Sequence, residues 1–140
     1  MAIHLTEAAQ QALIGDNASK GLRDYIGATP KLRFYTGAQN ANEESLPAGT
    51  LISTHTLAAF GAVSGGTITS VNATADAVTA AGGTIACWVL LKADDSTKIL
   101  DGSAAKTSGG DINLDENVVV GAGATVKMGN LALNMLHGNE

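Results

Sequence analysis

GGTIACWVLLKADDSTKILDGSA, residues 82–104, decides the fold because it contains two apolar strands joined by a polar turn. The first strand, residues 84–91, is apolar on both faces, so it belongs in a sheet that is covered on both sides. Its faces are formed by Ile85, Cys87, Val89 and Leu91 on one side and by Ala86, Trp88, Leu90 and Lys92 on the other. The Asp-Asp-Ser of residues 94–96 favours a turn and residues 97–103 return, which predicts a β-hairpin.

The chain before this hairpin also alternates with a period of two. Residues 31–37, KLRFYTG, predict a half-buried strand. Its faces are formed by Leu32, Phe34 and Thr36 on one side and by Lys31, Arg33 and Tyr35 on the other. A polar loop at 38–50, AQNANEESLPAGT, separates it from a β-branched strand at 50–60, and residues 65–75 predict a third strand.

Further short strands follow the hairpin. Residues 111–114 and 117–120 predict two of them, GAGA at 121–124 predicts a turn, and residues 125–135 predict one last long strand. Turn signals recur every 8 to 12 residues with no helices between the strands, as is typical of a sandwich. We therefore expect a mostly β chain, an antiparallel β-sandwich with a short N-terminal α-helix.

The helix is expected near the start of the chain. Thr6 can cap it, Glu7 suits the positive end of its dipole, and Gly15 ends it. Its apolar stripe consists of Leu5, Ala9, Ala12 and Leu13. A second, weaker helical turn is expected over 18–25. The chain is then one domain, 1–140, with an N-terminal helical arm at 1–30 and the sandwich at 31–136.

The composition indicates a protein that works packed against others. Charged residues are 15% of the 140 residues, against about a quarter in ordinary soluble domains. A surface with so few charges suits stable contact with neighbouring subunits. The net charge is −5, and only Lys20, Arg23, Lys31 and Arg33 of the eight basic residues lie near one another. We expect no direct nucleic-acid binding, because that requires a basic field.

The single cysteine, Cys87, excludes an intrachain disulfide and is expected to be a buried, inert thiol. The opening MAIHLTEAAQQ has neither the basic nor the apolar segment of a secretory signal. No stretch approaches the ~20 apolar residues of a membrane span. We therefore expect a protein made in a reducing cytoplasm, without membrane contact.

Residues 111–117, DINLDEN, place Asp111, Asn113 and Asp115 with the spacing of the first half of an EF-hand loop. That loop needs glycine at its sixth position and glutamate at its twelfth, where this chain has Glu116 and Ala122. Because Ile112 and Leu114 alternate with the polar residues, including Asn117 at the end of the run, we interpret the stretch as an edge strand with one solvated face.

Other residues with possible chemistry show no catalytic, cofactor or metal pattern. None of His4, His55 and His137 has a second ligand at metal-binding spacing, and His55 is expected at a surface or interface. The adjacent Glu43 and Glu44 are expected to be solvated. We expect no enzyme, no cofactor and no metal.

Trp88 has two interpretations. A lone tryptophan in an apolar strand is typical of a core or an interface. The alternative is a stacking platform for a sugar, which needs an exposed ring.

The chain resembles a group of small tailed-bacteriophage virion proteins. They share a run TSG-(G/A)-D-(I/L)-N-L, a short apolar strand, then GA-T-V and a final alternating strand, matched here by 108–114, 118–120 and 123–126. Upstream, (L)R-(I/F)-Y-(T/D)-G matches 32–37. A tryptophan strand with an LDG return matches Trp88 and residues 100–102.

The resemblance implies a virion structural component with no catalytic set. Our leading hypothesis is a capsid decoration (cement) protein on the capsid surface, made in the host cytoplasm, with the major capsid protein and further copies of itself as partners. A homotrimer is favoured because capsids offer threefold positions. The N-terminal residues and the 38–50 loop are expected to make the contacts. The alternatives are a tail, collar or baseplate subunit, and a carbohydrate-binding module for host attachment.

Overall fold

In a computed structural model the chain folds as short strands around one long hairpin. The described residues are 3–14, 21–62, 64–65, 67–70, 77–78, 81–106, 108, 112–114, 119–126, 128 and 130–134. The helices are α1 (Glu7–Ile14) and α2 (Leu22–Ile26). The strands are β1 (His4–Leu5), β2 (Lys31–Thr36), β3 (Leu51–Thr56), β4 (Thr67–Ser70), β5 (Ala77–Val78), β6 (Gly83–Leu91), β7 (Lys98–Lys106), β8 (Ile112–Leu114), β9 (Val119–Val120), β10 (Thr125–Val126) and β11 (Leu131–Asn134).

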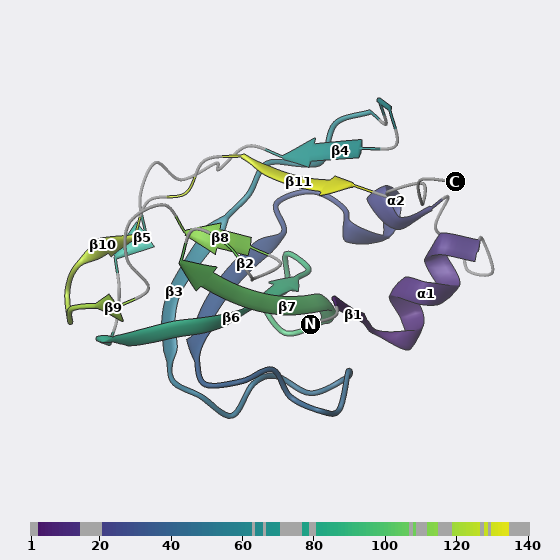
Figure 1. The fold of residues 1–140 in the computed structure, drawn as a ribbon. Helices are drawn as coiled ribbons and strands as arrows, with labels where there is room; N and C mark the ends of the chain where they lie inside the picture. The colour runs from purple at the N-terminus through teal and green to yellow at the C-terminus, as the bar shows by residue number, and fades with distance from the viewer. Residues whose placement is uncertain are drawn as a thin grey trace.

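The main sheet has the strand order β1-β7-β6-β2-β3, and all of these pairs are antiparallel (Figure 1). The predicted hairpin is its centre: β6 and β7 are nine residues each. β9 adds to β6, and β8 adds to β7 as a parallel neighbour, the one departure from the antiparallel pattern among the described strands. The prediction of a mostly β, largely antiparallel chain with a short N-terminal helix is confirmed.

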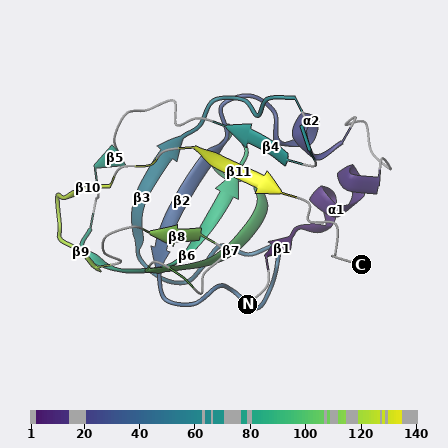
Figure 2. The same ribbon diagram turned by 45° about the horizontal axis from the view of Figure 1, so that its top comes forward.

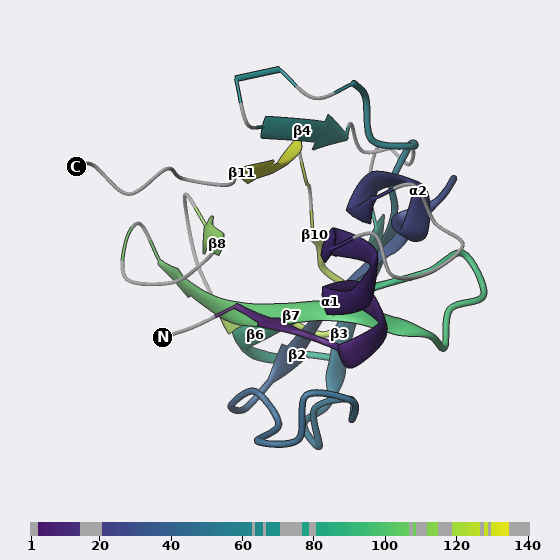
Figure 3. The ribbon, with the colours of Figure 1, turned by 90° about the vertical axis from the view of Figure 1, so that its right-hand side faces the viewer.

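The main sheet is covered on both faces, as its apolar centre predicts. The β4–β11 pair and the two helices lie over one face, and the 37–50 loop lies on the other (Figures 2 and 3). The second layer is thus a two-stranded pair with helices, and β5 and β10 form another small pair beside it. A sandwich of two full sheets stays a prediction.

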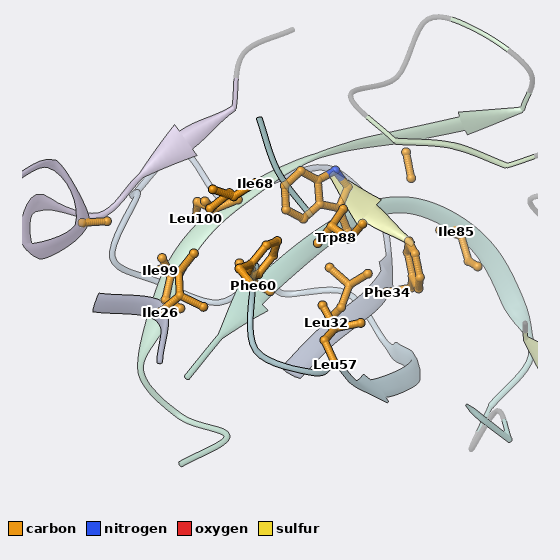
Figure 4. Packing of buried hydrophobic residues seen from close by; sticks show 14 of the residues in the cluster. Ile26, Leu32, Phe34, Leu57, Phe60, Ile68, Ile85, Trp88, Ile99 and Leu100 are labelled. Carbon is orange, nitrogen blue, oxygen red and sulfur yellow. The ribbon is translucent and has the colours of Figure 1, made fainter. Parts of the chain in front are cut away.

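The larger core cluster fills the space between the sheet and its helical cover (Figure 4). It draws on both helices and on β2, β3, β4, β6, β7 and β11. Its largest side chain is Trp88, which is 1% exposed and donates a hydrogen bond from Nε1 to the Ser103 carbonyl at 3.0 Å. The core interpretation of Trp88 is confirmed, and its ring is not available as a sugar platform.

A bulge in β6 changes which residues share a face. The strand pairs Cys87 with Tyr35 and Ile85 with Thr36, which leaves Ala86 as an extra residue. An extra residue shifts the alternation by one position. Ile85 therefore packs in the larger cluster rather than beside Cys87, and the prediction that these two share a face is wrong.

On the opposite face of the sheet a smaller cluster is buried. It consists of Tyr35, Cys87, Val89 and Leu91, with Leu51 packed against it.

The N-terminal helix begins where its cap predicts. The Ala9 N–H donates to Thr6 Oγ1 at 3.3 Å. Ala9 and Ala12 are fully buried, whereas Leu13 is 40% exposed, so the predicted stripe is narrower than expected. Gly15 lies outside the described residues. The second helix starts at Leu22, after Gly21, whereas the expected helical turn covered residues 18–25.

The last long strand predicted at 125–135 is two strands with different partners. β10 pairs with β5, and β11 pairs with β4. The predicted turn at 121–124 is present, closed by the Ala124 N–H on the Gly121 carbonyl. It positions β9 and β10 on either side.

Candidate interaction surface

The loop between β2 and β3, residues 37–50, is closed at its neck like an Ω-loop. The Thr36 N–H donates to the Thr50 carbonyl at 3.0 Å, and the Thr50 N–H donates to Thr36 Oγ1 at 2.8 Å. Only glycine fits beside this neck, because a Cβ on Gly49 would lie 1.7 Å from the Thr36 carbonyl oxygen. Gly49 therefore allows the chain to close the loop beside Thr36.

The body of the loop is held on the sheet by a buried ion pair on β7. Lys98 Nζ lies 2.7 Å from Asp101 Oδ2, and the two side chains are 2% and 0% exposed. Lys98 also donates to the Ser45 carbonyl at 2.8 Å, and Gln39 Nε2 donates to Asp101 Oδ1 at 3.2 Å. Gln39 and Ser45 of the loop are thus both bonded to the buried Lys98–Asp101 ion pair.

The tip of the loop is organised by its own side chains. Asn40 Oδ1 accepts from the Asn42 N–H, and Asn42 Oδ1 accepts from the Glu44 N–H, both at 3.0 Å. Glu44 Oε1 then accepts from the Glu7 N–H at 2.7 Å. A carboxylate at the first turn of α1 is favourable because it satisfies a free N–H at the positive end of the helix dipole.

The N-terminal segment joins the same network. β1 pairs with β7 so that His4 lies opposite Asp101, and the His4 Nδ1 atom is 3.4 Å from Asp101 Oδ1. The Thr6 N–H extends the attachment by donating to the Ile99 carbonyl at 3.0 Å. One carboxylate therefore receives groups from the N-terminus, the loop and its own strand.

We call residues 3–7 and 38–50 together the composite surface. Its exposed apolar side chains are Ile3, 44% exposed, and Leu46, 37% exposed. Ala41, Asn42 and Glu43 of the loop tip are exposed beside them in the chain. The two segments that the sequence predicts as contact elements are brought together by the fold.

The sequence did not indicate how Glu44 and Asp101 act. Glu44 was expected to be merely solvated, but its carboxylate also caps α1. Asp101 lies in the predicted return strand with no local sign that it is buried. The one signal available was the alternation that places Asp101 on the same face as Val89 of β6.

His55 is fully buried, so its predicted place at a surface or interface is wrong. Its ring stands edge-on to Phe34 with centroids 5.7 Å apart, and Nε2 lies 3.2 Å from Ser53 Oγ. Burial lowers the pKa of His55 below its ordinary value. The strand predicted from its alternation with Thr54 and Thr56 is present, but the His55 side chain points into the protein.

Cys87 is a buried free thiol, as predicted. Burial, with the nearby charge of Asp101, raises the pKa of Cys87 to about 11. A thiol with so high a pKa is a poor nucleophile near neutral pH.

The basic residues of the β2 and hairpin region are engaged within the fold. Arg33 pairs with Asp95, and Lys92 Nζ lies 3.7 Å from the centre of the Tyr25 ring. In the hairpin turn, hydrogen bonds from Thr97 and Ser96 lower the pKa of Asp94 to about 2.

The EF-hand-like run falls mostly outside the described residues. Asp111, Asp115, Glu116 and Asn117 lie there, as does His137, and the strand reading is supported only by β8 at Ile112–Leu114. In the part of the chain that the structure describes, no three His, Cys, Asp or Glu side chains gather as metal ligands. No helix among those residues is long and apolar enough to cross a membrane.

Comparison of the chain with protein-family models, with curated proteins and with solved structures found no match. The resemblance to phage virion proteins therefore stays a prediction from the sequence motifs.

Proposed function

We propose that the chain is a bacteriophage virion structural protein, a capsid decoration protein that binds the major capsid protein lattice through the composite surface. The observation that carries this proposal is the way the 37–50 loop is held. This loop has no regular secondary structure, but hydrogen bonds and a buried ion pair hold its neck, body and tip in place. Binding through a loop that is already ordered avoids the entropy cost of ordering it.

The positions that carry the resemblance also support the proposal, because they build the sheet that presents this surface. The RFYTG run forms β2 and the start of the loop. The tryptophan and LDG motifs face each other, since Trp88 pairs with Gly102 across β6 and β7. Asp101 of the LDG motif is the carboxylate on which the loop and the N-terminus meet.

The mechanism is mechanical. The composite surface buries Leu46 and Ile3 against the shell protein, while the acidic tip, with Glu43, favours a basic neighbourhood on the partner. Because the assembled lattice alone presents the complete site, binding stabilises the shell by mass action.

The test adds purified protein to expanded empty shells of the phage that encodes it and measures shell melting by calorimetry. We expect co-sedimentation with shells and a higher melting temperature. Leu46→Asp should abolish both effects, since it places a charge in the interface. The matched control is Val119→Asp, at an exposed valine on β9, which lies at the far end of the main sheet from α1 (Figures 1 and 2).

An unchanged melting temperature with the wild-type protein would contradict the decoration role. Imaging of the virion then separates the alternatives, because a tail, collar or baseplate subunit would appear at those positions instead of on the capsid.

A further inference from the structure

The N-terminal segment and the loop share one buried group, although they are far apart in the sequence. Asp101 Oδ1 lies 3.2 Å from Gln39 Nε2 of the loop and 3.4 Å from His4 Nδ1 of β1. Its other oxygen is taken by Lys98. Asp101 is 0% exposed in the closed arrangement, so these side chains supply the polar partners of its carboxylate.

Each segment is attached to the sheet by a small number of contacts. β1 has two residues paired with β7, His4 with Asp101 and Leu5 with Leu100. The loop has no ladder to the sheet and depends on side-chain contacts. A second link, from Glu44 to the Glu7 N–H, joins the two segments directly.

We propose that Asp101 couples the N-terminal strand to the 37–50 loop, so that the two segments open and close as one latch. When His4 leaves, the carboxylate loses a neighbouring imidazole and its contact with Gln39 changes, and the reverse holds equally. Coupling between two segments through a shared group is reciprocal. A partner that binds the loop in its closed position therefore also holds the N-terminal strand on β7, and this property belongs to the isolated chain whether or not it binds a shell.

The experiment is hydrogen exchange, measured on the full-length protein by mass spectrometry of peptides covering 3–8 and 38–48. His4→Ala removes only a side chain of β1, and Gln39→Ala removes only a side chain of the loop. We expect each variant to speed exchange about fivefold or more in the other segment as well as in its own. Asp101→Asn should speed exchange in both segments together, and by more than it speeds exchange in the β2–β6 pairing.

The matched control is Asp95→Asn, which breaks the ion pair with Arg33 elsewhere in the protein. It should leave both segments unchanged. The coupling is overturned if His4→Ala and Gln39→Ala each loosen their own segment alone, or if Asp95→Asn loosens both as strongly, because that would indicate a general loss of stability. Should Asp101→Asn fail to fold, the two alanine variants are measured again with Glu44→Ala, which removes the direct link to Glu7; loss of the cross-effect in that background would overturn the role of Asp101.

Discussion

At the scale of single residues, the packing of the main sheet depends on the Trp88 indole ring, which lies over Gly102, a residue without a side chain. Trp88 and Gly102 are cross-strand partners, and a Cβ on Gly102 would lie 2.6 Å from the indole ring. Protein cores are packed too closely for such an overlap to be absorbed without displacement. The glycine is therefore required by its neighbour.

Replacing Gly102 with alanine should destabilise the protein by about 1–3 kcal/mol, because the new methyl group displaces the indole or the β7 backbone. Urea unfolding followed by circular dichroism measures the change. The control is Gly121→Ala, where nothing lies within 4 Å of the added Cβ, and it should cost less than about 0.5 kcal/mol. Equal losses at the two positions would contradict the packing argument.

His55 should make stability depend on pH. Its pKa is lowered in the folded chain from the ordinary 6.5, so the unfolded chain takes up the proton first as the pH falls. Stability is therefore complete above the unfolded value and is lost as the pH falls toward the lower folded pKa. Urea midpoints at about pH 7.5 and about pH 5.5 should differ, and His55→Leu should reduce that difference. An unchanged pH dependence in the variant would show that His55 is not its source.

At the scale of elements, the alternation of apolar and polar residues predicted the strands. It could not predict contacts between segments that are distant in the sequence. The hairpin of β6 and β7 follows from side chains in adjacent positions, as does β2. The bulge at Ala86 was not visible, because it is set by the partner strand. Nor was the Glu44 cap on Glu7, since the residues lie 37 positions apart and nothing local marks the pair.

The same reasoning explains why the composite surface was predicted in parts but not as a unit. The polar loop and the N-terminus were each predicted as contact elements, because loops and termini commonly carry contacts. Their meeting point, Asp101, is one acid among many in the sequence, and only the tertiary fold shows that it is buried and paired with Lys98.

The ion pair that holds the loop should be costly to break from one side. Lys98→Met leaves the Asp101 carboxylate buried without its cation and should destabilise the protein by about 3–5 kcal/mol. The double variant Lys98→Met/Asp101→Leu removes both charges and should recover much of that loss. Chemical unfolding of the two variants gives both values. A double variant as unstable as the single one would contradict the charge-burial argument.

At the scale of the whole molecule, the two covers of the main sheet differ in kind. One face carries the apolar core under the helices and β4–β11, and the other carries the pinned loop over a smaller cluster (Figure 3). The larger face supplies the folding free energy through buried apolar area. The other face presents ordered polar and apolar groups outward, which suits contact with other proteins.

The low fraction of charged residues, 15%, should be accompanied by self-association. We expect sedimentation velocity to give a homotrimer that persists on dilution through the micromolar range. A monomer at every concentration would contradict the predicted oligomer.

The buried thiol of Cys87 can report how often the sheet opens. It is the only thiol in the chain, it is fully buried, and its pKa of about 11 keeps it protonated in the folded state. A sulfhydryl reagent can then modify the protein only during the moments when the sheet parts. The rate of modification therefore measures how often the sheet opens in the folded protein.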